Sequence, residues 1–170
     1  MVEFEYNSIT ESDIPILYGL NQQNKDKLSD VTPYRFRELV LESSWNCCAG
    51  DANAFILAFD QDFPHTNPNF LWFKERYPNF VYVDRVCVTT QDRGRGIGKT
   101  FYNKLIDYMR DNDQTLIAVT INYIPPNMIS ETFHKTMGFQ EVGKAVINNG
   151  ARTVKYWILN INEPHKYNAP

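Results

Sequence analysis

The chain has few cysteines, no long apolar run and no excess of basic residues. Its three cysteines, two of them adjacent at Cys47 and Cys48, form neither a disulfide framework nor a zinc-binding spacing, and we interpret them as small buried thiols. No apolar stretch is long enough to span a bilayer. The net charge of −3 argues against a general nucleic-acid-binding protein, so any polyanion site must be a local one. We expect no metal site.

The remaining composition is typical of a globular protein. A length of 170 residues, 43% hydrophobic and 22% charged, suits a single domain with a sizeable core, which we expect over residues 1–170. Glu3 and Glu5 lie where a secretory signal would be basic, so we expect a cytoplasmic protein.

Positions 93–100 read RGRGIGKT, and three known phosphate-binding motifs resemble this segment. The nucleotide P-loop needs a glycine six residues before its lysine, where this chain has Arg93. The dinucleotide motif G-x-G-x-x-G is met at Gly94 and Gly96, but Gly98 falls one place too early. The third template, R/Q-x-x-G-x-G/A of acyl-CoA transferases, is matched by Arg93, Gly96 and Gly98.

The neighbouring segments also speak against the first two templates. A dinucleotide fold places an acidic residue at the end of the next strand, about 20 residues on, where this chain has Asn122. A P-loop protein needs a strand with an aspartate for Mg²⁺, and the strand expected over 116–121 has no carboxylate.

The loop is suited to an anion for physical reasons. A strand, a glycine loop and a helix in succession point several N–H groups at one spot, and the helix dipole adds positive potential there. Glycine permits a positive φ and a close approach. Arg93, Arg95 and Lys99 add local positive charge to an acidic chain.

Hydrophobic periodicity and turn residues predict the order strand, two helices, three strands, helix, strand, helix, two strands. The strands are expected over residues 2–6, 45–49, 54–59, 80–89, 115–121, 139–147 and 153–159, the last two joined by a hairpin at Asn149-Gly150. The helices are expected from a capping box at 10–13 to about 28, from a Thr32-Pro33 cap to about 44, from 97 past 109, and over 127–137. Residues 61–79 are interpreted as a long connection whose aromatic side chains form either a packed surface element or a lid.

Two stretches resemble the signatures of the GNAT superfamily of N-acetyltransferases. VDRVCVTTQDRGRGIGKTFYNKL is similar to its central strand, pyrophosphate loop and following helix, and PPNMISETFHKTMGF is similar to its second signature, N-x-x-S-x-x-F-Y-x-K-x-G-F. The resemblance implies an α/β (α+β) fold with a mixed, bent sheet of about seven strands flanked by about four helices. Two neighbouring parallel strands would separate to admit acetyl-CoA as cosubstrate.

The resemblance also implies which residues bind acetyl-CoA. The backbone of the central strand would pair with the pantetheine arm, the loop amides would hold the pyrophosphate, and two residues of the second signature would lie near the thioester. These residues are Val86, Cys87 and Val88; Arg93, Gly94, Arg95, Gly96, Ile97, Gly98 and Lys99; and Asn127 and Ser130.

In this family the amine attacks the thioester directly, so no nucleophilic side chain is expected. Asp84, which alternation places on the face of Val86 and Val88, is the candidate general base; the alternative is that it pairs with a nearby cation or caps a turn. His134 stands where the family usually has tyrosine. It either protonates the departing thiolate, which requires the imidazolium form, or makes a hydrogen bond to the coenzyme or the backbone without proton transfer.

We therefore expect an acetyl-CoA-dependent N-acetyltransferase. The alternatives are a non-catalytic acyl-CoA-binding domain of the same fold and a P-loop nucleotide-binding module. The acceptor is open among an aminoglycoside, a polyamine, an amino acid, a peptide N-terminus and a protein lysine. Tyr34 and Arg35 would border it and could bind an acceptor carboxylate. A homodimer stays open; nucleic-acid and membrane partners are not expected.

Overall fold

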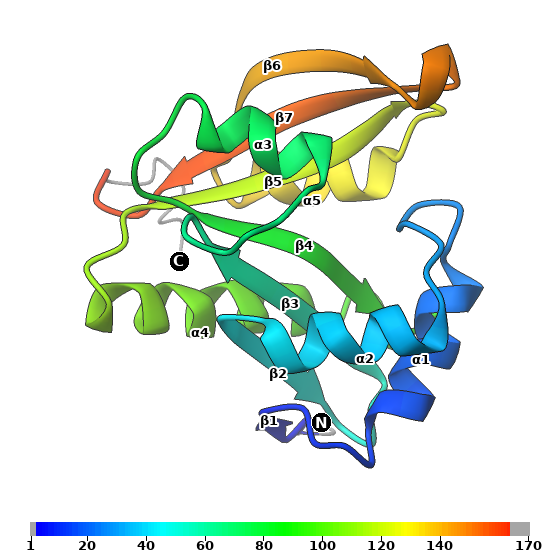
Figure 1. Ribbon diagram of the computed structural model, residues 1–170. Coiled ribbons are helices and arrows are strands. Elements are labelled where there is room, and N and C mark those ends of the chain that lie inside the picture. The colour runs from blue at the N-terminus through cyan, green and yellow to red at the C-terminus, as the bar shows by residue number, and fades with distance from the viewer. Residues whose placement is uncertain (1–2, 164–170) are drawn as a thin grey trace. The chain divides into compact units, whose positions relative to one another are not determined.

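The computed structural model describes residues 3–163, and the chain forms two compact units. Unit 1 comprises Met1–Phe59 and Asp84–Tyr108, and unit 2 comprises Asp60–Val83 and Met109–Pro170. Strand β4 (Val81–Val88) begins in unit 2 and ends in unit 1, whereas helix α4 (Ile97–Asp111) begins in unit 1 and ends in unit 2 (Figure 1).

Seven strands are linked by hydrogen bonds in the order β1-β2-β3-β4-β5-β7-β6. The pair β4–β5 is parallel, with Val81 opposite Ile117, while β2–β3, β5–β7 and β6–β7 are antiparallel. The mixed sheet of the α/β fold is therefore confirmed. The separation of two parallel neighbours and the single domain over 1–170 stay predictions.

Unit 1 contains two helices and three strands before β4. They are α1 (Ile14–Gln23), α2 (Pro33–Glu42), β1 (Tyr6–Asn7), β2 (Trp45–Ala49) and β3 (Ala54–Asp60, of which Asp60 lies in unit 2). The predicted cap at Thr32 is confirmed, since its hydroxyl accepts a hydrogen bond from the Arg35 N–H at 3.1 Å. In the core of this unit, the buried rings of Phe36 and Phe55 meet edge to face, with centroids 5.6 Å apart.

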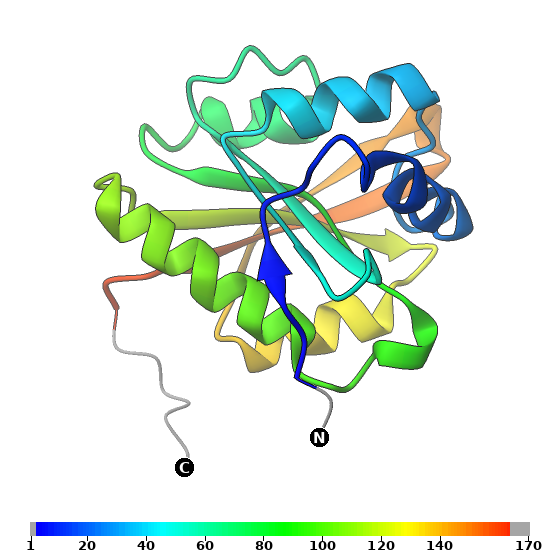
Figure 2. The same ribbon diagram turned by 90° about the horizontal axis from the view of Figure 1, so that it is seen from below.

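The first turn of α4 lies beside β1 in unit 1, as Figure 2 shows from below. Tyr6 of β1 meets Phe101 of α4 edge to face at 5.8 Å. The expected strand over residues 2–6 is thus short, Tyr6–Asn7, and residue 2 lies outside the described residues. The expected first helix ends earlier than predicted, at Gln23, because residues 24–28 form turns.

Apart from the parts of β4 and α4 that it shares with unit 1, the described part of unit 2 contains two α-helices and three strands. They are α3 (Pro68–Lys74), β5 (Leu116–Ile124), α5 (Met128–Thr136), β6 (Gln140–Ile147) and β7 (Arg152–Asn160). The predicted hairpin is confirmed: β6 and β7 pair antiparallel around a 3₁₀ turn at Asn148–Gly150, in which Asn149 and Gly150 both have positive φ.

Helix α3 was missed by the sequence analysis, which treated residues 61–79 as a connection. Asn67 caps it by accepting a hydrogen bond from the Asn69 N–H at 2.9 Å, and Pro68 follows in the first turn. This is the same cap-and-proline pattern that identified the helix after Thr32. Phe70 and Phe73 are fully buried, so the aromatic side chains of this segment pack into unit 2.

One glycine allows α3 to lie against the hairpin. A Cβ built on Gly143 of β6 would lie 2.5 Å from Cζ2 of Trp72. The indole cannot easily yield, because its ring stacks on Tyr156 at 4.2 Å and the guanidinium of Arg76 lies 4.2 Å from its centroid. A side chain at position 143 would therefore displace α3 or the strand.

We expect Gly143→Ala to lower the free energy of unfolding by about 1–3 kcal/mol, the usual effect of overpacking. Urea unfolding followed by tryptophan fluorescence measures this. Gly19→Ala in α1 is the matched control, since a Cβ there meets nothing within 4 Å, and alanine should stabilise the helix by about 1 kcal/mol. Equal stability of the Gly143→Ala protein and the wild type would contradict the packing argument.

Candidate functional site

The glycine loop of unit 1 has the backbone conformation that the sequence predicted. Gly94 and Gly96 have φ values of +76° and +84°, which L-residues rarely adopt, and a Cβ on either would meet nothing within 4 Å. The glycines are thus required by conformation rather than by crowding inside the protein. The space beside them is open, and the loop is exposed.

Helix α4 starts directly after this loop with a set of unpaired donors. Its first backbone hydrogen bond runs from the Thr100 N–H to the Gly96 carbonyl at 3.0 Å. Among residues 3–163, the N–H groups of Ile97, Gly98 and Lys99 have no hydrogen-bond acceptor. Three donors at the positive end of a 15-residue helix, next to open space, fit a phosphate or pyrophosphate group.

The charges around the loop are partly neutralised, which the sequence analysis did not foresee. Nη1 of Arg95 donates to the buried Asp92 carboxylate at 2.6 Å, and the guanidinium lies 4.6 Å from the Phe4 ring centroid. Arg93 donates to the Val88 carbonyl at 3.3 Å and to Asn24 at 3.1 Å. These contacts fix the loop, and the exposed Lys99 adds a further positive charge to it.

The candidate base Asp84 is paired with a cation, the alternative that the sequence left open. Nε of Arg85 donates to Oδ2 of Asp84 at 2.7 Å, and both side chains are buried. Strict alternation had placed these neighbours on opposite faces of β4. The contact forms because the arginine side chain is long enough to bend back to the Asp84 carboxylate.

The remainder of β4 follows the predicted alternation. Val86 and Val88 are half-buried, whereas Cys87 between them is buried. Burial raises the pKa of the Cys87 thiol to about 11, so it stays protonated at neutral pH. This agrees with a site that uses no cysteine nucleophile.

Helix α5 of unit 2 brings the other three predicted residues together. Asn127 is its N-cap, and its side-chain oxygen accepts a hydrogen bond from the Ser130 N–H at 3.3 Å. Nδ1 of His134 lies 2.7 Å from the Ser130 carbonyl and 3.3 Å from the Ser130 hydroxyl. A carbonyl can only accept, so Nδ1 carries the proton and Nε2 is the acceptor in the neutral ring.

The buried position of His134 decides its charge. The residue is only 3% exposed, and this burial lowers the pKa of its imidazole to about 4, although the hydrogen bond to Ser130 acts in the opposite direction. At neutral pH the ring is therefore neutral. The ring makes a hydrogen bond to the backbone at Ser130, and its role toward the coenzyme stays a prediction.

A buried ion-pair network that the sequence did not reveal fastens α5 to the hairpin. Nζ of Lys155 lies 3.3 Å from Glu131 of α5 and 3.2 Å from Glu141 of β6, and it lies over the Tyr123 ring at 4.4 Å. Lys135 pairs with the same Glu131 at 2.8 Å and, with Lys155, holds the pKa of that carboxyl below its usual range. The network holds the helix that carries Asn127, Ser130 and His134.

Arg35, proposed from the sequence to bind an acceptor carboxylate, forms ion pairs on its own helix. Its Nη1 lies 3.1 Å from Glu38 and 3.7 Å from Glu42, so its charge is already compensated on α2. Tyr34 is 70% exposed.

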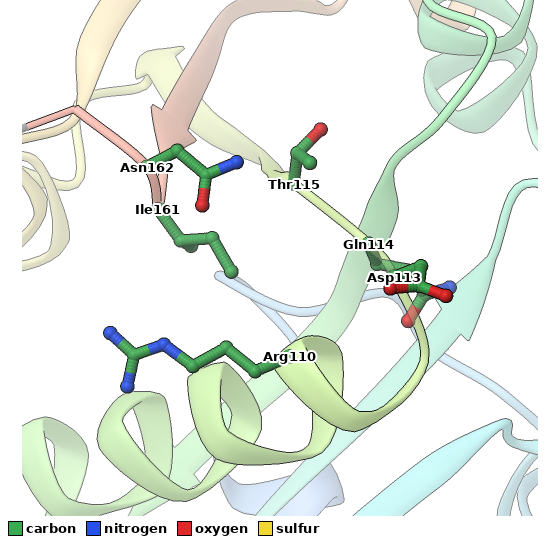
Figure 3. A pocket seen from close by; sticks show the side chains of 6 residues that line it. All are labelled: Arg110, Asp113, Gln114, Thr115, Ile161 and Asn162. Carbon is green, nitrogen blue, oxygen red and sulfur yellow. The ribbon is translucent and has the colours of Figure 1, made fainter.

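A pocket of about 200 Å³ in unit 2 involves none of the predicted residues (Figure 3). It is lined by Arg110, Asp113, Gln114, Thr115, Ile161 and Asn162. Within residues 3–163, no group of three or more His, Cys, Asp or Glu side chains is placed to hold a metal ion. The same part of the chain contains no helix with both the length and the apolar character needed to cross a membrane.

Comparison with protein families identifies the chain. A family model described as acetyltransferase (GNAT) domain matches residues 73–159, more than half of the 170 residues. The chain therefore belongs to the GNAT family of acetyltransferases. Members of this family use acetyl-CoA as cosubstrate, as the sequence analysis predicted. No curated protein matches the chain.

Solved structures share the fold at low sequence identity. The NatC complex bound to Gag peptide and CoA is 18% identical, with a TM-score of 0.72 over 94% of this chain and 99% of that chain. NAA60 from Arabidopsis thaliana in complex with acetyl-CoA is 16% identical, with a TM-score of 0.72 over 95% and 100%. The ribosomal-protein-S18-alanine N-acetyltransferase from Escherichia coli is 14% identical, with a TM-score of 0.68 over 99% and 100%.

The low pKa of His134 predicts a pH-dependent stability. Above pH 6.5 the ring is neutral in both the folded and the unfolded chain; between pH 6.5 and 4 only the unfolded chain takes up the proton, so stability falls as pH falls. We expect this one group to remove up to about 3 kcal/mol of unfolding free energy by pH 4. Urea unfolding of the wild type and His134→Asn at pH 8, 5.5 and 4.5 measures the contribution.

The comparison at pH 8, where the His134 ring is neutral in both the folded and the unfolded wild type, supplies the baseline difference between the two proteins. Asparagine retains an N–H for the Ser130 carbonyl, so the variant isolates titration of the ring from loss of that hydrogen bond. Parallel stability curves for the two proteins between pH 8 and 4.5 would show that His134 titrates normally.

Proposed function

We propose that this protein is an N-acetyltransferase that moves the acetyl group of acetyl-CoA to a primary amine by direct attack on the thioester. One observation carries the proposal. Within the family motif, the N–H groups of Ile97, Gly98 and Lys99 at a helix N-terminus have no acceptor among the described residues, and a Cβ on Gly94 or Gly96 just before them would meet nothing within 4 Å.

Each predicted residue has a role in this proposal. The amides of the loop, from Arg93 or Gly94 through Lys99, bind the pyrophosphate, and the backbone of Val86, Cys87 and Val88 binds the pantetheine arm. Acetyl-CoA, when bound, supplies an activated acetyl thioester. Asn127 and Ser130 bind near the pantetheine or the thioester, and His134 presents Nε2 as a hydrogen-bond acceptor.

Asp84 is the proposed base for the amine. A carboxylate can remove the proton directly or through a held water molecule. The task is smaller for a peptide α-amine, with a pKa of about 8, than for a lysine, with a pKa of about 10.4. Two of the structural neighbours described above point to protein or peptide acceptors: one is a ribosomal-protein-S18-alanine N-acetyltransferase by name, and the other is bound to Gag peptide. Peptides therefore head the acceptors to test.

An acceptor screen with acetyl-CoA tests the function directly. Free thiol is measured while peptides, amino acids, polyamines, aminoglycosides and lysine-containing proteins are added in turn. Thiol release that depends on one class of amine supports the proposal and names the acceptor. Coenzyme binding without release for any amine would instead support the non-catalytic acyl-CoA-binding alternative. The cytoplasmic location stays a prediction.

The loop should lose the coenzyme when Gly96 is replaced. Valine cannot easily adopt φ near +84°, and its side chain enters the space beside the loop, so we expect Gly96→Val to weaken coenzyme A binding at least about tenfold. Calorimetry measures the dissociation constant. Gly150→Val is the matched control, since Gly150 has φ of +89° and equally open space but lies in the β6–β7 turn. Equal weakening in both variants would point to a loss of folding instead of a lost site.

His134 should not set the alkaline limb of the pH–rate profile. With a pKa of about 4, only about one ring in 10³ is protonated at pH 7, too few for the imidazolium to act as the general acid. We expect His134→Asn to leave the alkaline limb of kcat at the same pH, whatever its effect on kcat itself. A limb that moves to higher pH in His134→Tyr, with wild-type activity declining above pH 6.5, would restore the proton-donor assignment.

A further inference from the structure

Arg85 makes three hydrogen bonds from inside unit 1, and none of them was anticipated from the sequence. Nε donates to Oδ2 of Asp84 at 2.7 Å, Nη1 to Oδ1 of Asn21 at 2.7 Å, and Nη2 to the hydroxyl of Ser29 at 2.8 Å. Arg85 is 4% exposed and Asn21 is fully buried. Each nitrogen of the guanidinium thus has an acceptor on a different part of the unit.

The acceptors connect β4 to α1 and to the segment that follows it. Asn21 lies in the last turn of α1, and Ser29 lies in residues 24–32, the connection between α1 and α2. The same connection is held by a hydrogen bond from the Asn21 amide to the Ser29 carbonyl at 3.4 Å. The planar guanidinium of Arg85 therefore holds both the Asp84 carboxylate and the loop of residues 24–32.

A buried guanidinium is stable only when its charge and its donors are matched. Here the charge is matched by Asp84 and the remaining donors by neutral oxygens of Asn21 and Ser29. Lysine cannot reproduce this arrangement, because its single ammonium lacks the planar fork. The geometry of the Asp84 carboxylate thus depends on Arg85.

We propose that Arg85 is a positioning residue for Asp84: it fixes the orientation of the carboxylate and ties that orientation to residues 24–32. The proposal rests on the proposed function, in which Asp84 takes the proton of the amine. Arg85 acts through Asp84 and through the loop, and it contacts neither the amine nor the coenzyme in this role.

A double-mutant cycle tests whether Arg85 acts through Asp84. The wild type, Arg85→Lys, Asp84→Asn and the double variant are compared in kcat, in KM for the amine and in the dissociation constant for coenzyme A. We expect Arg85→Lys to lower kcat roughly 10- to 100-fold, as for a catalytic group displaced by about 1 Å. KM and coenzyme affinity should change less than about threefold, and the double variant should match Asp84→Asn alone.

Two results overturn the proposal while leaving the proposed function intact: an Arg85→Lys enzyme with wild-type kcat, or losses that multiply in the double variant. If Asp84→Asn alone keeps the wild-type kcat, the proposed base is wrong, and the positioning role falls with it. If Arg85→Lys fails to fold, Ser29→Ala takes its place in the cycle, since it removes one acceptor of Arg85 and leaves the Arg85–Asp84 pair. We expect Ser29→Ala to lower kcat roughly threefold, because it releases only the loop.

Amide hydrogen exchange tests the tie between Arg85 and residues 24–32. It needs no turnover, so it can be measured even if no amine is acetylated. The amides of Lys27 and Leu28 both donate to the Asn24 carbonyl within the connection. They should exchange faster in Arg85→Lys and Ser29→Ala than in the wild type; unchanged exchange overturns the tie to this loop. Arg37→Lys is the matched control, because Arg37 makes a forked but exposed pair with Glu11.

Discussion

The N-terminus of α4 imposes the constraint on which the rest of the site depends. A helix start leaves backbone donors that must find an acceptor, and here the residues before the helix provide none for Ile97, Gly98 and Lys99. The two glycines with positive φ keep the approach to these donors clear. Asp92 and its ion pair with Arg95 hold the loop in this shape, so the proposed anion site would be prepared before any ligand arrives.

In the described part of each unit, a buried cation joins two or more elements. In unit 1, Arg85 joins Asp84 to α1 and its following loop. In unit 2, Lys155 joins α5 to the β6–β7 hairpin through Glu131 and Glu141. Such pairs add little net stability, because desolvation opposes their attraction, but their geometry is strict. Their contribution is therefore to orientation: they fix where a carboxylate or a helix lies.

The sequence predicted most elements, because long periodic segments and strong caps need only local information. It missed α3 because seven residues are too few to show a helical period, although Asn67-Pro68 gave the cap signal. Alternation along β4 did not reveal the pair of Asp84 with its neighbour Arg85, because alternation describes where a side chain leaves the backbone, not where a long side chain ends. The loop glycines were found because their requirement is conformational and local.

His134 shows why the charge of a site residue could not be predicted. The motif identifies the position, but the pKa of the imidazole depends on how deeply the tertiary structure buries it. A tyrosine at this position would offer a hydroxyl donor, whereas the histidine, with Nδ1–H committed to Ser130, offers an acceptor at Nε2. Histidine in place of tyrosine therefore reverses the direction of the hydrogen bond at this position, so a ligand group that faces Nε2 must itself be a donor. Under the proposed function, we therefore expect a group other than this ring to supply the proton to the departing thiolate.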